Sequence, residues 1–479
     1  ATLAVPDASG PFGLTAEALS NGQPVAMELT GEGFFAFLSG RAVPVKLRLS
    51  AGESIVAFEG RGGFSPLTAK GAMAANLSDL PALGGLWGAE LSRPGAGLGR
   101  DKLTVAGELT VDGSGSAFLR GAEIEADENQ LSGDFDLEPG KKRLKLTAEL
   151  EAGPLVLGSG EDGDEGDSAA TEGWSNDEID LSALADLDAE IGLRAPSLTL
   201  GRLKLDDVRS QITVERSRAV IDIRKAEAYG GKVSGDFVVN GRDGLSVGGR
   251  LKLEGLETEP LFTDLAGWDR LVSTGDFDVE FLGGGNSTAE IMSSLAGKGS
   301  LNLGPGEIRG IDIAAILQTL DPDYVGEGER TDFDAMTGTF EIADGVLSNK
   351  DLKMTARHFT ASGAGEIDIG RQRLDYRLRP TALQDEDGTG GVMVPLLITG
   401  RWANPRFELD LEGVAREKVE DKVEEVADMT KAELEKRLEE ELGVDLKPKK
   451  KPKPEDIIAD KAQDALEDEA KKLLLDILD

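Results

Sequence analysis

Alternation of apolar and polar residues is the feature that most constrains this chain. In residues 275–283, which read GDFDVEFLG, Phe277, Val279 and Phe281 alternate with three acidic side chains. Successive side chains of a strand point to opposite faces, so this run predicts a strand with one apolar and one charged face. Similar short runs follow one another at spacings of mostly about 10–12 residues, which indicates an antiparallel meander, sandwich or barrel-like sheet.

The β-like runs form two stretches with an acidic segment between them. We expect an N-terminal β-sheet body over residues 1–158, an acidic linker or loop over 159–190, and a second β body over 191–411. Residues 161–180 contain nine acidic residues and no basic one, which favours a solvated linker. A Ca²⁺ site is the alternative there, although the ligand order of an EF-hand and its closing Glu are absent.

Short helices are expected to interrupt the second body. Apolar residues at helical spacing predict them over residues 259–269, 286–297 and 310–322. Asp312 is placed to cap the third helix, and Gly297 is placed to end the second.

The last part of the chain, residues 412–479, has the pattern of two amphipathic helices joined by a basic Lys/Pro spacer at 446–454. We expect the spacer to be a solvated linker, with contact to anionic lipid headgroups as the alternative. The final helix is expected to pack on another helix or to cap the sheet edge, because its polar face is rich in acids that an anionic bilayer would repel.

Composition disfavours several classes of function. The chain has 52 basic and 89 acidic residues, a formal net charge of −37, which disfavours a general nucleic-acid binder. It has no Cys and a single His, His358, so thiol chemistry and zinc–thiolate sites are excluded and a Ser–His–Asp triad has little material. We therefore expect a non-enzyme without cofactor or metal. A hydrolase with a pair of catalytic acids is the weaker alternative.

Other features concern membranes and packing. No window of 18 residues is apolar and free of charge, so no membrane-spanning helix is predicted. No signal peptide opens the chain and residue 1 is Ala, from which we expect a mature or truncated piece. Gly accounts for 62 of 479 residues and aromatic residues for 5%, which suits an unfilled, curved sheet better than a tightly filled core.

Three segments resemble a known family. They are AYGGKVSGDFVVNG (228–241), the run from LETEPLFTDLAGWDRL to GIDIAAIL (256–317), and VPLLITGRWANPRFELDLEGVAREKVE (394–420). In wording and in order they are similar to the C-terminal region of the AsmA family of Gram-negative envelope proteins. The resemblance covers about 195–440 and is weaker over 1–158.

The resemblance implies a place and a function. AsmA proteins are anchored in the inner membrane by an N-terminal helix, project into the periplasm, and are similar to bridge-like lipid-transfer proteins. For function, the resemblance implies phospholipid movement toward the outer membrane and support of outer-membrane biogenesis. For partners, it implies phospholipid, bacterial membranes and possibly outer-membrane assembly proteins. The family carries no catalytic residues to transfer, and because this sequence shows no anchor helix we expect an excised periplasmic part.

We therefore expect a mainly β protein whose elongated, curved, largely antiparallel sheet forms an open groove, with short capping helices and a C-terminal pair of amphipathic helices. Acyl chains would lie along the apolar face. The alternatives are an ordinary sandwich core for these same residues, and a non-catalytic scaffold for outer-membrane protein assembly or targeting. The candidate lining residues are Phe277, Val279, Phe281, Leu301, Leu303, Ile212, Val214, Ile221, Ile223, Val233 and Leu374.

Overall fold

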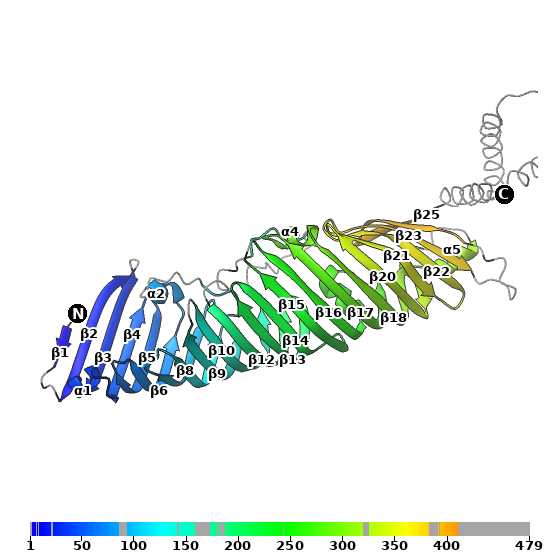
Figure 1. Cartoon of the computed structure of the whole chain (residues 1–479). Coiled ribbons are helices and arrows are strands. Elements are labelled where there is room, and N and C mark those ends of the chain that lie inside the picture. Colours follow the sequence, from blue (N-terminus) through cyan, green and yellow to red (C-terminus); the bar gives the residue numbers. More distant parts are fainter. Residues whose placement is uncertain are drawn as a thin grey trace, which may run out of the picture.

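The structure, a computed structural model, is an elongated protein built on one continuous β-sheet (Figure 1). It describes residues 2–410 except 6, 8, 21–22, 86–92, 141–142, 159–172, 180, 182–186, 243, 320–324, 383–390 and 392. The expected helical tail at 412–479 and its spacer at 446–454 lie outside the described residues.

The first part of the sheet is an antiparallel meander in which each strand pairs with the next along the chain up to β10. Its strands are β1 (Thr2–Ala4), β2 (Pro11–Ser20), β3 (Gln23–Glu32), β4 (Val43–Ala51), β5 (Ser54–Gly63), β6 (Thr68–Asn76), β7 (Leu103–Val111), β8 (Ala117–Ala126), β9 (Asn129–Pro139), β10 (Leu144–Ala152) and β11 (Leu155–Leu157). Two short helices, α1 (Phe34–Leu38) and α2 (Leu80–Gly84), connect β3 to β4 and β6 to β7.

The second part continues the meander, and β18 pairs with both β19 and β20. Its strands are β12 (Leu187–Leu200), β13 (Leu203–Glu215), β14 (Arg218–Ala228), β15 (Gly231–Asn240), β16 (Ser246–Glu257), β17 (Leu271–Gly284), β18 (Ala296–Ile311), β19 (Val325–Phe333), β20 (Ala335–Ala343), β21 (Val346–Thr355), β22 (Phe359–Asp368), β23 (Arg373–Ala382), β24 (Leu396–Arg401) and β25 (Asn404–Leu409). Its helices are α3 (Thr258–Ala266), α4 (Thr288–Ser293) and α5 (Ile313–Thr319).

The two β bodies join into one sheet through parallel pairing. β12 lies beside β10, with Leu146 opposite Ala189 and Leu150 opposite Leu193, and it also pairs with β11. These are the parallel pairs among the described strands; the other pairings are antiparallel. β12 begins at Leu187, inside the range that the sequence assigned to the linker. Because β12 runs parallel to β10 and β11, the chain must cross back to the start of β10 before β12 begins. This requires a long connection, and the segment between β11 and β12 is long enough to provide it.

The predicted helices form close to their expected positions. Asp312 caps α5 as expected, since its carboxylate accepts from the amide of Ala315 at 2.9 Å. Ser287 caps α4 by accepting from the amide of Glu290 at 3.2 Å. The prediction that Gly297 ends α4 was wrong: α4 ends at Ser293, and Gly297 lies in β18 opposite Phe281.

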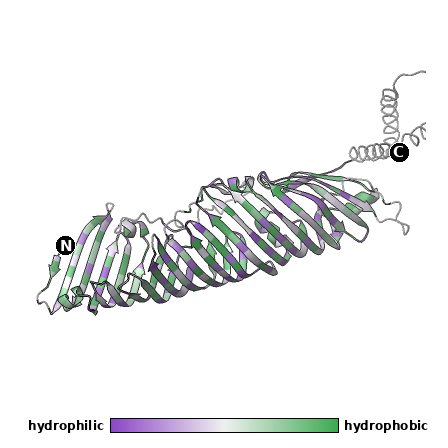
Figure 2. Cartoon of the chain, in the orientation of Figure 1, coloured by the Kyte–Doolittle hydropathy of each residue, from purple (hydrophilic) through white to green (hydrophobic). Residues whose placement is uncertain are grey.

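The sheet has two long edges, which we call rims. The first rim carries α1, α4 and the turns at Ser217, Gly241 and Ile369; the second rim carries α2, α3 and α5. Figure 1 shows the strands following one another along the length of the molecule from the N-terminal end. Figure 2 shows apolar and polar residues alternating along the strands, as the period of two predicts.

Candidate functional site

A single apolar face runs across the sheet from strand to strand. Residues directly opposite one another in neighbouring strands lie on the same face, so the register traces it. One cross-strand row, which we call the apolar row, contains four of the predicted residues, Ile212, Ile221, Phe281 and Leu374. It reads Ile212, Ile221, Phe237, Gly249, Phe281, Gly297, Ile342, Leu347, Ile367, Leu374 and crosses from β13 to β23.

The other predicted residues lie on the same face. Val214 and Ile223 flank the apolar row on β13 and β14, and Val279 lies two residues from Phe281 on β17. A second row is parallel to the first and joins Val233, Leu253, Phe277 and Leu301, with Leu303 two residues further along β18. The structure thus places all eleven predicted residues on one face of one sheet.

Burial differs between the two sides of this face. Toward the second rim, α3 and α5 pack on it: Phe277 is buried and meets Phe262 of α3 edge-on at 6.0 Å, and Leu303 is 2% exposed. Ile316 of α5 belongs to the same core. Val233 is buried in the same core, whereas Val214 is buried nearer the first rim, in a separate cluster with Ala189 and Ala219. Around Phe277, Leu303 and Val233, the face is filled by the protein's own side chains, although by helices rather than by the second sheet of a sandwich.

The other seven predicted residues are only half-buried, and most of them lie closer to the first rim than Phe277, although Ile342 of the apolar row is itself buried. Phe281, Val279 and Leu374 are in this class. So are Leu301, Ile212, Ile221 and Ile223. These side chains therefore keep part of their apolar surface accessible, which a filled core would not leave. They form the part of the face that a ligand could contact.

Glycines allow large rings to lie across the neighbouring strands. Gly249 separates Phe237 from Phe281 in the apolar row, and the two rings meet at 6.0 Å. A Cβ on Gly299 would lie 2.4 Å from the ring of Phe340. Such contacts give a physical reason for the high glycine content. Because glycine has no side chain, the ring on the neighbouring strand can pack flat against the backbone of the sheet.

The opposite face is charged. One row on it joins Asp236 on β15, Arg250 on β16, Glu280 on β17 and Lys298 on β18. Glu280 forms ion pairs with Arg250 at 3.5 Å and with Lys298 at 3.6 Å. Because these groups are exposed to solvent, the pairs add little stability, and they keep this face soluble.

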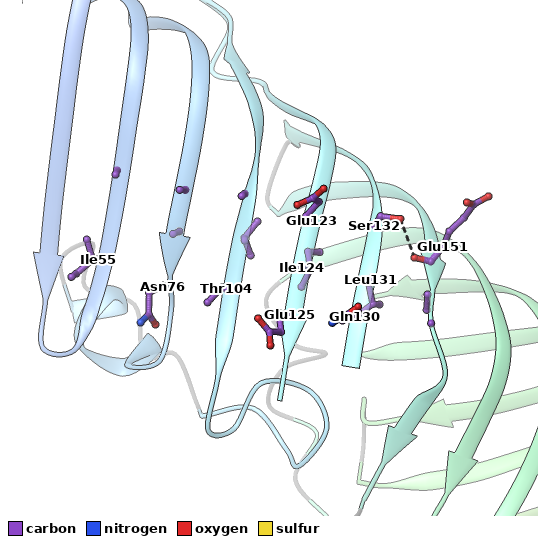
Figure 3. A pocket seen from close by; sticks show the side chains of 17 residues that line it. Ile55, Asn76, Thr104, Glu123, Ile124, Glu125, Gln130, Leu131, Ser132 and Glu151 are labelled. Atoms are coloured by element: carbon purple, nitrogen blue, oxygen red, sulfur yellow. Dashed lines mark hydrogen bonds between the residues drawn. The ribbon is translucent and has the colours of Figure 1, made fainter. Parts of the chain in front are cut away.

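Two hollows in the described surface are lined by none of the residues of the apolar row. One of about 1040 Å³ spans β5 to β10 and is shown in Figure 3. Its lining mixes apolar residues such as Ile124 and Leu131 with Glu123, Glu125 and Glu151. A second, of about 590 Å³, lies over the charged row at Arg250 and Glu280. The sequence indicated neither hollow. Small residues such as Ala57, Ala74 and Ala106, which line the first one, have no spacing or motif that would mark a binding site.

Among the described residues, we recognise no catalytic arrangement of titratable groups. His358 is exposed in the turn between β21 and β22. Burial and the carboxylate of Asp264, which accepts from the hydroxyl at 2.9 Å, raise the pKa of Tyr229 to about 12. Burial also raises the pKa of Tyr376, with a smaller effect of Asp351. Among the residues that the structure describes, no group of three or more potential ligands could hold a metal ion.

Residues 173–179, which composition marked only as linker, form a strap along the first rim. The indole of Trp174 donates to the carbonyl of Ile369 at 2.8 Å, and its ring meets Trp402 edge-on at 6.1 Å. Further along the strap, the amide of Ile179 donates to Asn286 at 2.8 Å. The acidic composition of this region gave no indication of the strap, and Trp174, its one aromatic residue, was the clearest signal that could have indicated it.

The fold and this face define a class: an elongated protein with one open, curved sheet that is apolar on one face and charged on the other. The model of the AsmA family matches residues 164–352, which confirms the recognition of AsmA sequence in this chain. The match includes the segments 228–241 and 256–317. No curated protein and no solved structure matches the chain. In the described part of the chain, none of the helices has the length and apolar character needed to span a membrane.

Proposed function

We propose that this protein carries phospholipid along the apolar face of its sheet, between the inner and outer membranes of a Gram-negative envelope, and so supports outer-membrane biogenesis. In this proposal it is periplasmic, attached to the inner membrane, and not an enzyme. AsmA family membership fits an envelope and lipid-transport role. The observation that carries the proposal is the apolar row, which continues from Ile212 to Leu374 without a charged residue.

The energetics favour a continuous face. An acyl chain of about sixteen carbons loses roughly 12 kcal/mol when it moves into water, at ~0.8 kcal/mol per CH₂. A route between membranes must therefore keep the chain on apolar surface throughout. The described residues form a ladder of 25 strands, in which β11 lies end to end with β10 and β19 lies end to end with β20. At ~4.8 Å per strand, this ladder extends roughly 100 Å before twist is counted.

The half-buried side chains near the first rim define the route. Phe281 and Ile221 are accessible there, whereas α3 and α5 occupy the face near the second rim. We therefore place the acyl chains along the apolar row, with the headgroups toward the first rim. Phe277, Leu303 and Val233 are then covered by the core near the second rim, and Val214 by its own cluster near the first rim, so these four residues lie beside the route rather than line it.

Native mass spectrometry of the purified chain tests the proposal, with bound phospholipid as the expected result. Protein that is free of lipid after detergent-free purification, and that takes up none from vesicles, would contradict it.

A scaffold for outer-membrane protein assembly is the second candidate, because α3 and α5 already fill one side of the face. Deleting residues 446–479 separates the two functions. A scaffold that uses the tail would lose its protein partner, whereas a lipid carrier would keep its bound lipid.

A further inference from the structure

Exposed apolar side chains gather at the N-terminal end of the first rim. Phe35 and Leu38 of α1 are 62% and 38% exposed, and Phe64 and Leu67 in the turn between β5 and β6 are 59% and 60% exposed. We call these four residues the phenylalanine patch. α1 and the turn are joined, because the amide of Phe64 donates to the carbonyl of Phe37 at 2.8 Å and the two rings meet at 6.1 Å.

The patch stands on a rigid aromatic base. Phe12 of β2 contacts Phe34 at 5.4 Å and Phe37 at 5.2 Å, and both Phe12 and Phe37 are buried. The same cluster includes Val45 and Phe58 on the apolar face of β4 and β5. The exposed phenylalanines are therefore held outward by a packed support, and that support is continuous with the apolar face.

Charge near the patch differs from the charge of the chain as a whole. Arg41, which follows α1, is exposed and has no carboxylate partner within the described part of the chain. Arg61 donates to the carbonyl of Ala42. The nearest acids in sequence are Glu32 before α1 and Glu59 on β5, which pairs with Lys46 at 2.7 Å. On the adjacent turn, the amides of Ser114 and Ser116 donate to the carboxylate of Asp112. In a chain of net charge −37, this corner presents cations beside exposed rings.

We propose that the phenylalanine patch is a docking surface for a lipid bilayer. Exposed aromatic and leucine side chains next to arginine match the interface of a bilayer, where rings enter the acyl boundary and guanidinium groups meet phosphate. Continuity with the apolar face argues for a lipid occupant, because the exposed rings and the buried cluster around Phe12 form one apolar region that leads from the patch to the apolar face of the sheet. The docking surface would stand even if the sheet carried no lipid.

The test uses the full chain and its lack of cysteine, which allows unique labelling. Phe35→Cys and Leu19→Cys each receive an environment-sensitive fluorophore. Leu19 is 76% exposed and lies at the opposite end of β2, where it pairs with Pro24. On addition of phosphatidylcholine vesicles that contain phosphatidylglycerol, we expect a blue shift at position 35 and none at position 19.

A binding series completes the test. Phe35→Ser with Phe64→Ser should lower vesicle binding roughly tenfold, whereas Leu19→Ser should leave it unchanged. Arg41→Gln should weaken binding roughly fivefold, and only when phosphatidylglycerol is present. Equal shifts at both labels, or no shift at position 35, would overturn the proposal. So would a dimer that the serine pair dissociates, because the patch would then bind a second copy. Lipid capture at Phe281 is measured separately, so that loss of docking and loss of lipid carriage are distinguishable.

Discussion

Phe281 and Leu282 are neighbours in the chain and lie on opposite faces of β17. Phe281 is half-buried in the apolar row between Gly249 and Gly297, and Leu282 is 60% exposed on the other face. The two positions share a strand, a rim and an apolar side chain. They differ in the face that they occupy, so they form a matched pair for testing where lipid binds.

Replacing Phe281 with Asp should reduce the bound lipid. An acyl chain that lies over a carboxylate in the apolar row would remove water from that carboxylate. This desolvation costs about 2–4 kcal/mol and therefore weakens lipid binding. Asp is smaller than Phe, and the residues opposite it in the neighbouring strands are glycines without side chains, so the sheet should still form. Native mass spectrometry measures the lipid. Leu282→Asp is the control and should retain lipid; equal loss in both variants would remove the assignment of the apolar row.

Asp127 should make the N-terminal part sensitive to acid. Burial of its carboxyl opposes ionisation, but the amides of Asp101, Lys102, Gly99 and Arg100 donate to it, and together they lower its pKa from 3.8 to about 2. A lowered folded-state pKa gives stability that is present above the unfolded value and is lost as pH falls through the folded value. The loss is therefore expected between about pH 4 and pH 2.

Urea unfolding against pH measures this contribution. Asp127→Asn keeps the positive backbone angle that Asn tolerates, and it should lower stability at neutral pH by about 1–2 kcal/mol after solvent screening is allowed for. It should also flatten the acid dependence. A variant with the same pH profile as the parent would show that the carboxylate is unimportant for the loop at 97–102.

Trp174→Ala should release the strap from the first rim. The change removes the hydrogen bond to Ile369 and the ring contact with Trp402, and we expect a local destabilisation of about 1–3 kcal/mol. Hydrogen exchange at the amides of Ile179 and Ala289 reports it, because both amides donate across the strap contact. Trp174→Phe keeps a ring without the donor and should show a smaller effect. Unchanged exchange in the Ala variant would mean that other contacts hold the strap.

Gly31→Ala should destabilise the N-terminal end through overpacking. A Cβ there would lie 2.6 Å from Cζ of Phe12, and crowding of this kind costs about 1–3 kcal/mol. In a Phe12→Leu background the same change should cost less, because the ring that it meets is gone. A double-mutant cycle from urea unfolding measures the coupling between the two positions. A coupling energy of zero would contradict the proposed ring-over-glycine contact.

The faces of the strands could be predicted from sequence, because side chains alternate regardless of how the strands pair. Phe277, Val279 and Phe281 share a face as the period of two required. The helices α3, α4 and α5 were predicted within a few residues because polar caps and apolar spacing signalled them. α1 and α2 were missed, since each has five residues and is too short for a helical period.

Long-range relationships could not be predicted in the same way. The parallel pairing of β10 with β12 depends on where a long acidic connection returns, which local patterns do not specify. Gly297 resembled a helix stop, although it lies in β18 directly opposite Phe281 on the adjacent strand β17. Burial of Phe277 against Phe262 depends on how α3 folds back over the sheet. Alternation therefore identified the face, and only the tertiary structure separates its filled side from its accessible side.

Photo-crosslinking in cells at positions 281 and 282 tests the central claim most directly. A photoreactive residue at 281 should capture phospholipid, and the same residue at 282, one position along β17 on the charged face, should capture none. Equal capture at the two positions, or capture at 282 alone, would contradict the claim that acyl chains travel on the apolar row.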